Sequence, residues 1–134
     1  KQHEIRRKYA QIYEAELSAV PEIMTPQAEE LNPIGKQAIS VHSWHLYIIQ
    51  LQTSQIKINR DEFIDEMGDR NVECSVHYIP LNLFPFYQKR YGYQVGDFPN
   101  AEFAFQRVVS LPMHPGLTEE DIYIVIDTIK KILA

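Results

Sequence analysis

We start the prediction of the fold from the stretch Cys74-Ser75-Val76-His77-Tyr78-Ile79-Pro80-Leu81-Asn82-Leu83-Phe84-Pro85-Phe86-Tyr87. This stretch continues an alternation of apolar and polar residues that starts at Val72, and successive side chains of a strand point to opposite faces. The pattern predicts a strand from Val72 to Tyr78 in which His77 faces away from the side that buries Val76. Pro80 has no N–H to give to a sheet, so an aromatic, proline-rich loop is expected after it.

The junction between this strand and its loop has two interpretations. A polar strand end that leads into a rigid aromatic loop suits contact with a ligand. The same alternation also fits a solvated sheet face followed by a packed surface loop. The residues of this stretch leave both interpretations open.

Composition narrows the class of protein. The chain has 134 residues, 45% hydrophobic and 23% charged, which is typical of one globular domain with a modest core. A net charge of −5 argues against a nucleic-acid partner. Cys74 is the only cysteine, so an internal disulfide is excluded and a reducing, cytoplasmic location is expected. We identify neither a signal peptide nor an apolar run near the ~20 residues that span a membrane.

Hydrophobic periodicity predicts the other elements. Apolar residues at helical spacing from Ile5 to Leu17 predict an opening helix over 1–17. An irregular connection follows over 22–37, with room for a short strand at Ile23-Met24. The strongest predicted strand runs over 39–52. Its apolar centre, from Leu46 to Ile49, suggests a central strand covered on both faces, and we interpret His45 as a hydrogen-bonded structural histidine.

The second half of the chain alternates short helices with a further strand. Asn59-Arg60-Asp61-Glu62 has the form of a capping box at a helix start. A helical turn is expected at 86–90, a helix from Pro99 or Asn100, and a short strand over Val109-Ser110-Leu111. Thr118-Glu119-Glu120-Asp121 caps a last helix with a clean apolar stripe. We therefore predict an α+β fold, in which a small three-stranded, mostly antiparallel sheet is packed by helices.

The first residues of the chain bear on whether it is part of a longer protein. Residue 1 is Lys, and it falls inside the predicted opening helix and not before it. We expect the sequence to be a piece of a longer chain, in which 1–17 is an interdomain helix and 38–134 is the sheet-and-helix body.

Sequence motifs for chemistry are missing. We find no G-x-G-x-x-G, no P-loop and no G-x-S-x-G elbow. None of the five histidines pairs with a convincing nucleophile along the sequence, and we expect no metal site. From the residues alone, the hypothesis is an α+β domain with a contact surface around His77 and the loop after it.

An ordered set of motifs adds a resemblance to a known family. The set is Val76-His77-Tyr78-Ile79-Pro80-Leu81, Phe84-Pro85-Phe86-Tyr87, Tyr91-Gly92-Tyr93, 96–102 (Gly-Asp-Phe-Pro-Asn-Ala-Glu) and 110–118 (Ser-Leu-Pro-Met-His-Pro-Gly-Leu-Thr), with Trp44-His45-Leu46-Tyr47 before them. It resembles the C-terminal small domain of the DegT-type nucleotide-sugar aminotransferases, over nearly the whole chain.

The resemblance implies a function for the parent protein. These enzymes depend on pyridoxal phosphate (PLP), have the fold-type I aminotransferase architecture, and are typically homodimers. They move an amino group from glutamate to a nucleotide-linked keto-sugar for polysaccharide, glycan or antibiotic synthesis. A large N-terminal domain holds the cofactor through a Schiff-base lysine. None of the lysines here lies in a segment that resembles that site, so we expect this chain alone to be inactive and not to bind PLP.

The resemblance also implies the site residues. The histidine of the family's VHY segment reaches toward the active site, so His77, with Tyr78 beside it, is expected to bind substrate, together with Asn82 in the loop. Two positions depart from the family. Asn82 is commonly histidine, and an amide cannot shuttle protons; Gln50 is often arginine, so a charge pair is lost. The segments at 98–102 and 110–118 are interpreted as structural.

Three readings of the chain compete. In the first, it is the small domain of a sugar aminotransferase; in the second, it is a non-catalytic binding or scaffold domain with the same fold; in the third, it belongs to a regulatory or degenerate homologue that kept the fold and lost the lysine. The opening helix separates the first two. An apolar surface on Ile5, Tyr9, Ile12 and Tyr13 that is open to solvent would imply a missing partner domain, whereas a covered helix would favour the second reading.

Overall fold

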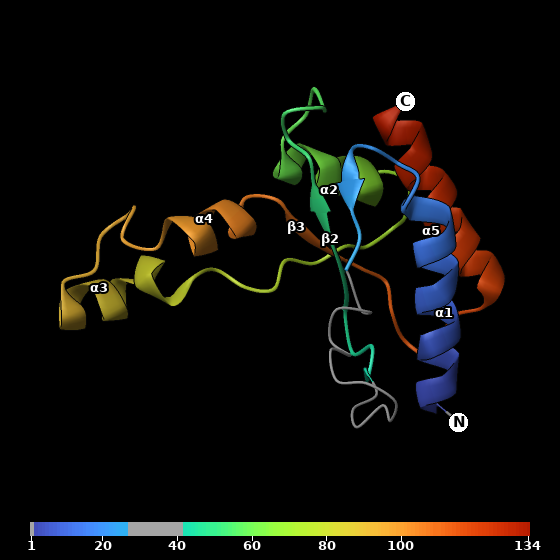
Figure 1. Cartoon of the computed structure of the whole chain (residues 1–134), viewed down its shortest axis with the longest axis horizontal. Coiled ribbons are helices and arrows are strands. Elements are labelled where there is room, and N and C mark those ends of the chain that lie inside the picture. The colour runs from blue at the N-terminus through green and yellow to red at the C-terminus, as the bar shows by residue number, and fades with distance from the viewer. Residues whose placement is uncertain (1, 27–41) are drawn as a thin grey trace, which may run out of the picture.

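The computed structural model describes residues 2–26 and 42–134 and has a small antiparallel sheet covered by helices (Figure 1). The elements in chain order are α1 (Gln2–Leu17), β1 (Ile23–Met24), β2 (Tyr47–Leu51), α2 (Arg60–Gly68), the 3-10 helix η2 (Leu81–Leu83), α3 (Pro85–Tyr91), α4 (Pro99–Phe105), β3 (Val108–Leu111) and α5 (Glu119–Leu133). The predicted α+β class with a three-stranded antiparallel sheet is confirmed.

The sheet has the order β1-β2-β3, and both pairs are antiparallel. Tyr47, Ile49 and Leu51 of β2 are fully buried, whereas Ile48 and Gln50 are half-buried. The central position of β2 is therefore confirmed, but the two faces are not covered equally. The strand is also shorter than predicted. It begins at Tyr47, after Trp44 with its positive φ of 48°, and residues 39–41 of the prediction lie outside the described part.

The predicted strand over Val72–Tyr78 is wrong. The segment touches the sheet only through Ser75, which pairs with Ser110 of β3 by Ser75 N–H donating to Ser110 O at 3.1 Å and Ser110 N–H donating to Ser75 O at 2.8 Å. Beyond Ser75 the chain diverges from β3, so no further ladder forms. The burial that alternation predicted fades along with it, from a buried Val72 to a half-buried Val76. The third strand is instead β1, at Ile23–Met24, where the sequence allowed a short strand.

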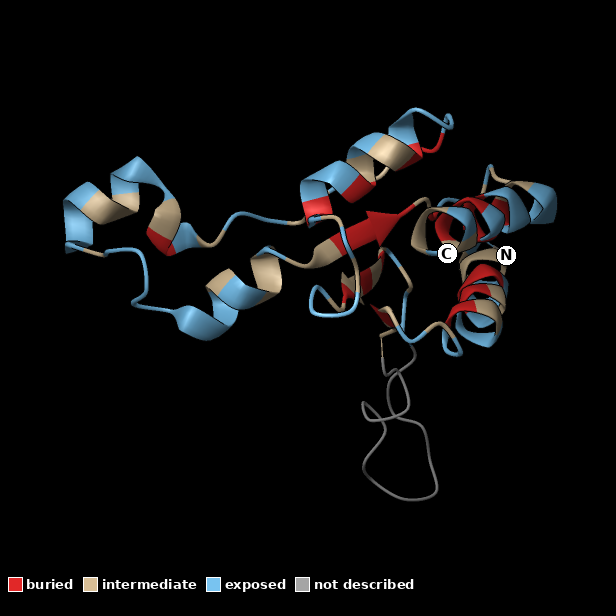
Figure 2. Cartoon of the chain, turned by 90° about the horizontal axis from the view of Figure 1, so that it is seen from above, coloured by how far each residue is buried: buried red, intermediate tan, exposed pale blue. Residues whose placement is uncertain are grey.

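Helices α1 and α5 lie side by side, and each contributes four of the buried hydrophobic side chains of the core (Figures 1 and 2). On α1, Tyr9, Tyr13 and Leu17 are buried, while Ile5 and Ile12 are half-buried and packed against the core. Tyrosine hydroxyls tie the helix to the chain around β3, and the Tyr13 hydroxyl donates to Pro112 O at 2.9 Å. The open apolar surface that would have marked a missing partner domain is therefore not on α1.

Helix starts follow the sequence closely. At the start of α2, Asn59 accepts from the N–H groups of Asp61 and Glu62, and the Glu62 carboxylate accepts from Asn59 N–H in return. Thr118 and Asp121 form the same reciprocal pair at the start of α5. The predicted capping box of α2 and the predicted cap of α5 are confirmed, as is the stripe of α5, in which Ile122, Val125, Ile126 and Ile129 are buried and Leu133 packs against the core.

Burial also sets the ionisation of three core groups. Cys74 packs against the core as a small hydrophobe, and burial raises the pKa of its thiol to about 12. Burial raises the pKa of the Tyr13 phenol well above its usual value. Burial and then the Glu14 carboxylate, which accepts from the Tyr47 hydroxyl at 3.1 Å, do the same to the pKa of Tyr47. All three groups are held neutral in the folded chain.

These pKa values predict a loss of stability in alkali. Each group is raised in the folded state, so its contribution is full below the unfolded pKa and falls as pH rises towards the folded value. For Cys74 this window runs from the ordinary value of 9.0 to about 12. We expect the free energy of unfolding, from urea titrations at several pH values, to fall across this window, and each group adds up to about 1.4 kcal/mol per pH unit to the slope.

Cys74→Ala isolates one of the three contributions. The variant should show a slope shallower by about one proton between pH 9 and 12, whatever its stability at pH 7. An unchanged slope would contradict a buried, protonated Cys74.

Candidate functional site

Residues 79–107, called the arm below, project away from the sheet and the α1–α5 pair (Figures 1 and 2). The arm carries η2, α3 and α4. Prolines at the first turns of α3 and α4 suit helix starts, because their missing N–H has no intrahelical partner there. Gly92 ends α3 with a φ of 74°, a left-handed conformation that favours glycine.

The arm has no buried apolar core of its own. Within residues 2–26 and 42–134, none of the buried hydrophobic side chains belongs to the arm, where Asn82 is the single buried residue. Large apolar side chains on the arm are exposed instead: Ile79, Leu81, Phe84, Phe86, Tyr91, Val95, Phe98 and Phe103. Tyr78 precedes them at 76% exposure. This is the apolar surface that sequence reasoning sought on α1.

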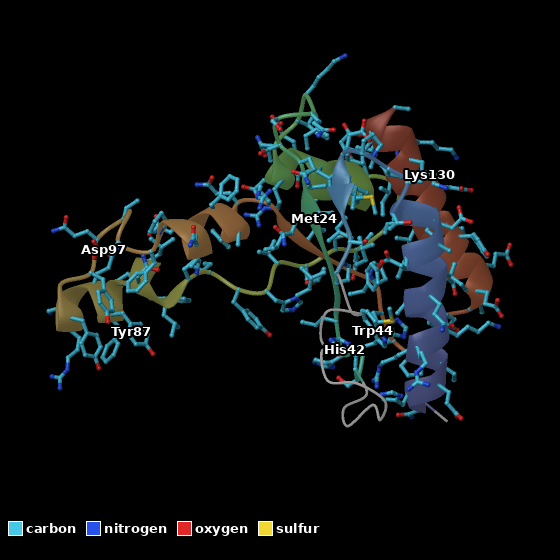
Figure 3. All side chains as sticks on the ribbon, in the orientation of Figure 1. Met24, His42, Trp44, Tyr87, Asp97 and Lys130 are labelled. Atoms are coloured by element: carbon cyan, nitrogen blue, oxygen red, sulfur yellow. The ribbon has the colours of Figure 1, made fainter. Side chains whose placement is uncertain are left out.

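Polar bonds and ring contacts hold the arm together. Glu102 of α4 accepts from Asn82 Nδ2 at 2.8 Å and, through both carboxylate oxygens, from Gly96 N–H at 3.0 Å. One carboxylate thus joins η2, the 92–98 loop and α4. Aromatic rings continue the connection from α3 into the loop, in the order Phe86, Tyr87, Tyr91, Tyr93 and Phe98, with neighbouring centroids 5.3 to 6.1 Å apart. Figure 3 shows Tyr87 and Asp97 in this outer part, far from Lys130 on α5.

Residues of the arm line an open cavity of about 530 Å³, and Asn82 is one of them. Its other walls are apolar or aromatic, from Pro80, Leu81, Tyr87, Tyr91, Tyr93, Phe98 and Ala101. A few polar groups in an apolar concave surface are typical of sites for organic ligands.

His77 and Tyr78 directly precede the arm, at its attachment to the sheet; this position is called the root of the arm below. His77 is half-buried, and its Nδ1 lies 2.8 Å from the hydroxyl oxygen of Ser110 on β3. The ring of Tyr78 meets it edge-on at 4.7 Å, and the peptide bond between the two residues is cis. His77 therefore does not stand free on a solvated face, as the alternation suggested; one ring nitrogen is held by the sheet.

The three predicted site residues divide between two places. His77 contacts β3, whereas Asn82 is held inside the arm by α4. Sequence reasoning missed the two residues that hold them, Ser110 and Glu102, because both lie in segments interpreted as structural. A serine between apolar neighbours on a strand was the available signal, since a buried hydroxyl needs a hydrogen-bond partner.

Two further sequence interpretations change. His45 is exposed and precedes β2, so it does not lie in the apolar strand setting on which its interpretation as a hydrogen-bonded structural histidine depended. Gln50, where the family often has arginine, lies within β2, and its Oε1 accepts from Arg107 Nη2 at 2.8 Å. Arg107 also lies over the Phe103 ring, 3.9 Å from its centroid. A neutral amide thus satisfies an arginine at this position.

The described lysines do not fit a cofactor-holding site. Such a lysine needs an amine that loses its proton readily, usually in a desolvated pocket. Lys8 and Lys130 are in ion pairs with Glu119 and Glu16, and the bond to Glu119 raises the pKa of Lys8. The others in the described part, Lys57, Lys89 and Lys131, are exposed. We therefore derive no step through PLP on this chain.

The described residues were also considered as metal ligands and as membrane spans. No cluster of three or more His, Cys, Asp or Glu side chains in ranges 2–26 and 42–134 could hold a metal ion. In the same ranges, no helix has both the length and the apolar character to cross a membrane.

Comparison with known proteins places these features in context. An uncharacterized protein of Methanocaldococcus jannaschii, MJ1066, is 41% identical over 129 residues, which are 96% of this chain and 31% of that protein. The spore coat polysaccharide biosynthesis protein SpsC of Bacillus subtilis is 33% identical over the same shares of the two chains. This chain therefore spans about a third of the length of its curated relatives.

Solved structures share the fold. The aminotransferase TlmJ from Streptoalloteichus hindustanus matches with a TM-score of 0.77 and 27% identity, over 98% of this chain and 32% of that one. A PMP-form structure from Streptococcus pneumoniae, Spr1654, assigned as a sugar aminotransferase, matches with a TM-score of 0.78 and 25% identity, over 98% and 31% of the two chains.

The family model that matches this sequence covers residues 1–130, almost its full length. With the predicted motifs in place and the fold shared, the chain belongs to the DegT/DnrJ/EryC1/StrS aminotransferase family.

Proposed function

We propose that this chain is the substrate-side small domain of a PLP-dependent nucleotide-sugar aminotransferase. The parent would transfer an amino group from glutamate to a nucleotide-linked keto-sugar for polysaccharide or glycan synthesis, in the cytoplasm. The observation that carries the proposal is the family match over residues 1–130 in a chain one third as long as its relatives. The relative SpsC, which is named for polysaccharide biosynthesis, supports the sugar substrate.

In this proposal the reactive amine lies outside residues 1–134. PLP bound in the parent would supply the electron sink for amino transfer. The described lysines favour this division, because each is exposed or ion-paired. The part played by this chain is then to bind the sugar side of the substrate and to exclude water.

His77, Tyr78 and Asn82 are the residues we assign to substrate binding. The imidazole of His77, held at the root of the arm, offers its second ring nitrogen to a sugar hydroxyl or a group near the cofactor. Tyr78, 76% exposed, offers ring surface and a hydroxyl. Asn82 offers an amide in a cavity with aromatic walls, which suits the faces of sugar rings.

The arm suggests how the chain joins the rest of its protein. A segment with eight exposed large apolar side chains and no buried ones gains stability when another surface covers it. We infer that the large domain of the parent protein covers the arm, and that the parent is a homodimer with the active site near this contact. The match covers only 31% of each relative, so the rest of those proteins is long enough to contain such a domain.

A second candidate is a non-catalytic binding or regulatory domain with the same fold. The burial of the apolar face of α1 favours this second candidate, because an open apolar face on that helix would have indicated a missing partner domain. In this alternative the parent protein has lost the cofactor lysine, and the apolar arm binds a different protein.

Cofactor chemistry separates the two candidates. We expect this chain alone, mixed with PLP and then treated with borohydride, to give no stoichiometric adduct at a single lysine. The full-length protein should give one adduct per subunit, at a lysine outside residues 1–134, by peptide mass spectrometry. Full-length protein without the adduct would favour the non-catalytic domain, and a 1:1 adduct within this chain would contradict both candidates.

Removing the imidazole at the root of the arm tests the assigned site. In the full-length enzyme, His77→Ala should lower kcat/KM for the keto-sugar about tenfold or more, since one hydrogen bond to the reacting substrate is lost. The fold should stay intact, although some stability is lost because the buried Ser110 hydroxyl loses its side-chain partner. His3→Ala on α1 is the matched control, and equal kinetics for both variants would remove His77 from the site.

A surface substitution tests the covering of the arm. Phe86 is 66% exposed here, so Phe86→Ser should leave the stability of this chain nearly unchanged. In the full-length protein the same change should cost about 1–3 kcal/mol in unfolding free energy, if the ring is buried there. Ile124→Ser on α5, at 51% exposure, is the control. Equally small effects of both variants on the unfolding free energy of the full-length protein would contradict the proposal that the arm is covered.

A further inference from the structure

The hydroxyl of Ser110 is a buried polar group that the assigned site does not yet use. Ser110 is 4% exposed and lies between the buried side chains of Val109 and Leu111 on β3. Its backbone is fixed on both edges of the strand, because it exchanges two hydrogen bonds with Ser75 and stands opposite Ile48 of β2. The hydroxyl oxygen therefore has a set position, 2.8 Å from His77 Nδ1.

The chemistry of this pair sets the direction of the hydrogen bond. A neutral imidazole has one N–H donor and one acceptor nitrogen, and a hydroxyl can either donate or accept. Among the described residues, His77 is the one side-chain partner of the Ser110 hydroxyl. If Nδ1–H were the donor, the hydroxyl proton would be left buried without an acceptor, which costs more than an unused lone pair on oxygen. The hydroxyl therefore donates, and Nδ1 accepts.

We propose that Ser110 is a positioning residue that holds His77 as the Nε2–H tautomer, so that the imidazole offers an N–H donor at the root of the arm. The ring cannot turn without breaking the bond to β3, and the edge-on Tyr78 ring restricts it further. A donor at this point selects an acceptor oxygen on the ligand, such as a sugar hydroxyl or carbonyl. That last step rests on the proposed function, whereas the tautomer depends on this chain alone.

The tautomer can be read directly by NMR. In ¹⁵N-histidine-labelled chain, two-bond ¹H–¹⁵N correlation spectra at pH 8 distinguish protonated from unprotonated ring nitrogens, and a His77→Gln sample assigns the signals. We expect His77 in the natural sequence to be almost wholly Nε2–H. Ser110→Thr, which keeps a hydroxyl, should preserve that state, and Ser110→Ala should give a mixture of tautomers. The melting temperature of each variant reports folding.

The outcomes separate this inference from the proposed function. An Nδ1–H tautomer in the natural sequence, or the same tautomer population in Ser110→Ala, would overturn the inference; if Ser110→Ala does not fold, the natural sequence and Ser110→Thr still decide it. Turnover of a keto-sugar by full-length variants is the second readout. If Ser110→Ala mixes the tautomers but leaves kcat and KM unchanged, the positioning stands and the substrate role of His77 falls. A rise in KM rescued by Ser110→Thr supports both.

Discussion

The structure depends on the backbone pairing of β3, which is bonded along both edges. On one edge it forms the ladder with β2, and on the other it takes up the single residue Ser75. The arm begins a few residues after Ser75 and ends directly before Val108, so the chain is attached to this strand on both sides of the arm. Buried Arg60 reinforces the second end: its Nη1 donates to Phe105 O at 2.9 Å, and its guanidinium lies over the Phe105 ring.

This attachment joins two parts that are stabilised in different ways. The sheet with α1, α2 and α5 contains the buried apolar side chains described here, and it resembles an ordinary small domain core. The arm relies on one carboxylate, Glu102, and on a row of aromatic contacts at its surface. Because hydrophobic burial is the main favourable term in folding, the arm adds little to the stability of the chain by itself. Its order therefore depends on the root at β3 and on any surface that covers it.

Sequence reasoning recovered the features that local physics determines. The capping boxes at Asn59 and Thr118 and the stripe of α5 depend on residues three or four positions apart, so the pattern is complete in the sequence. The strand predicted over 72–78 failed, because alternation reports which side chains can be buried and says nothing of whether a partner edge continues. Two residues, Ile23 and Met24, completed the sheet instead, because they pair with Leu51 and Gln50 on the edge of β2 that β3 leaves free.

The site shows the same limit. His77, Tyr78 and Asn82 could be named from a resemblance, but Ser110 and Glu102, which hold two of them, are 33 and 20 residues away in sequence and are found only through the fold. Their partners also differ in kind. Glu102 binds the amide of Asn82, a group that neither gives nor takes a proton. Ser110 binds an imidazole, which can do both. Of the two, His77 is therefore the one whose side chain is attached directly to the sheet, through the hydroxyl of Ser110 on β3.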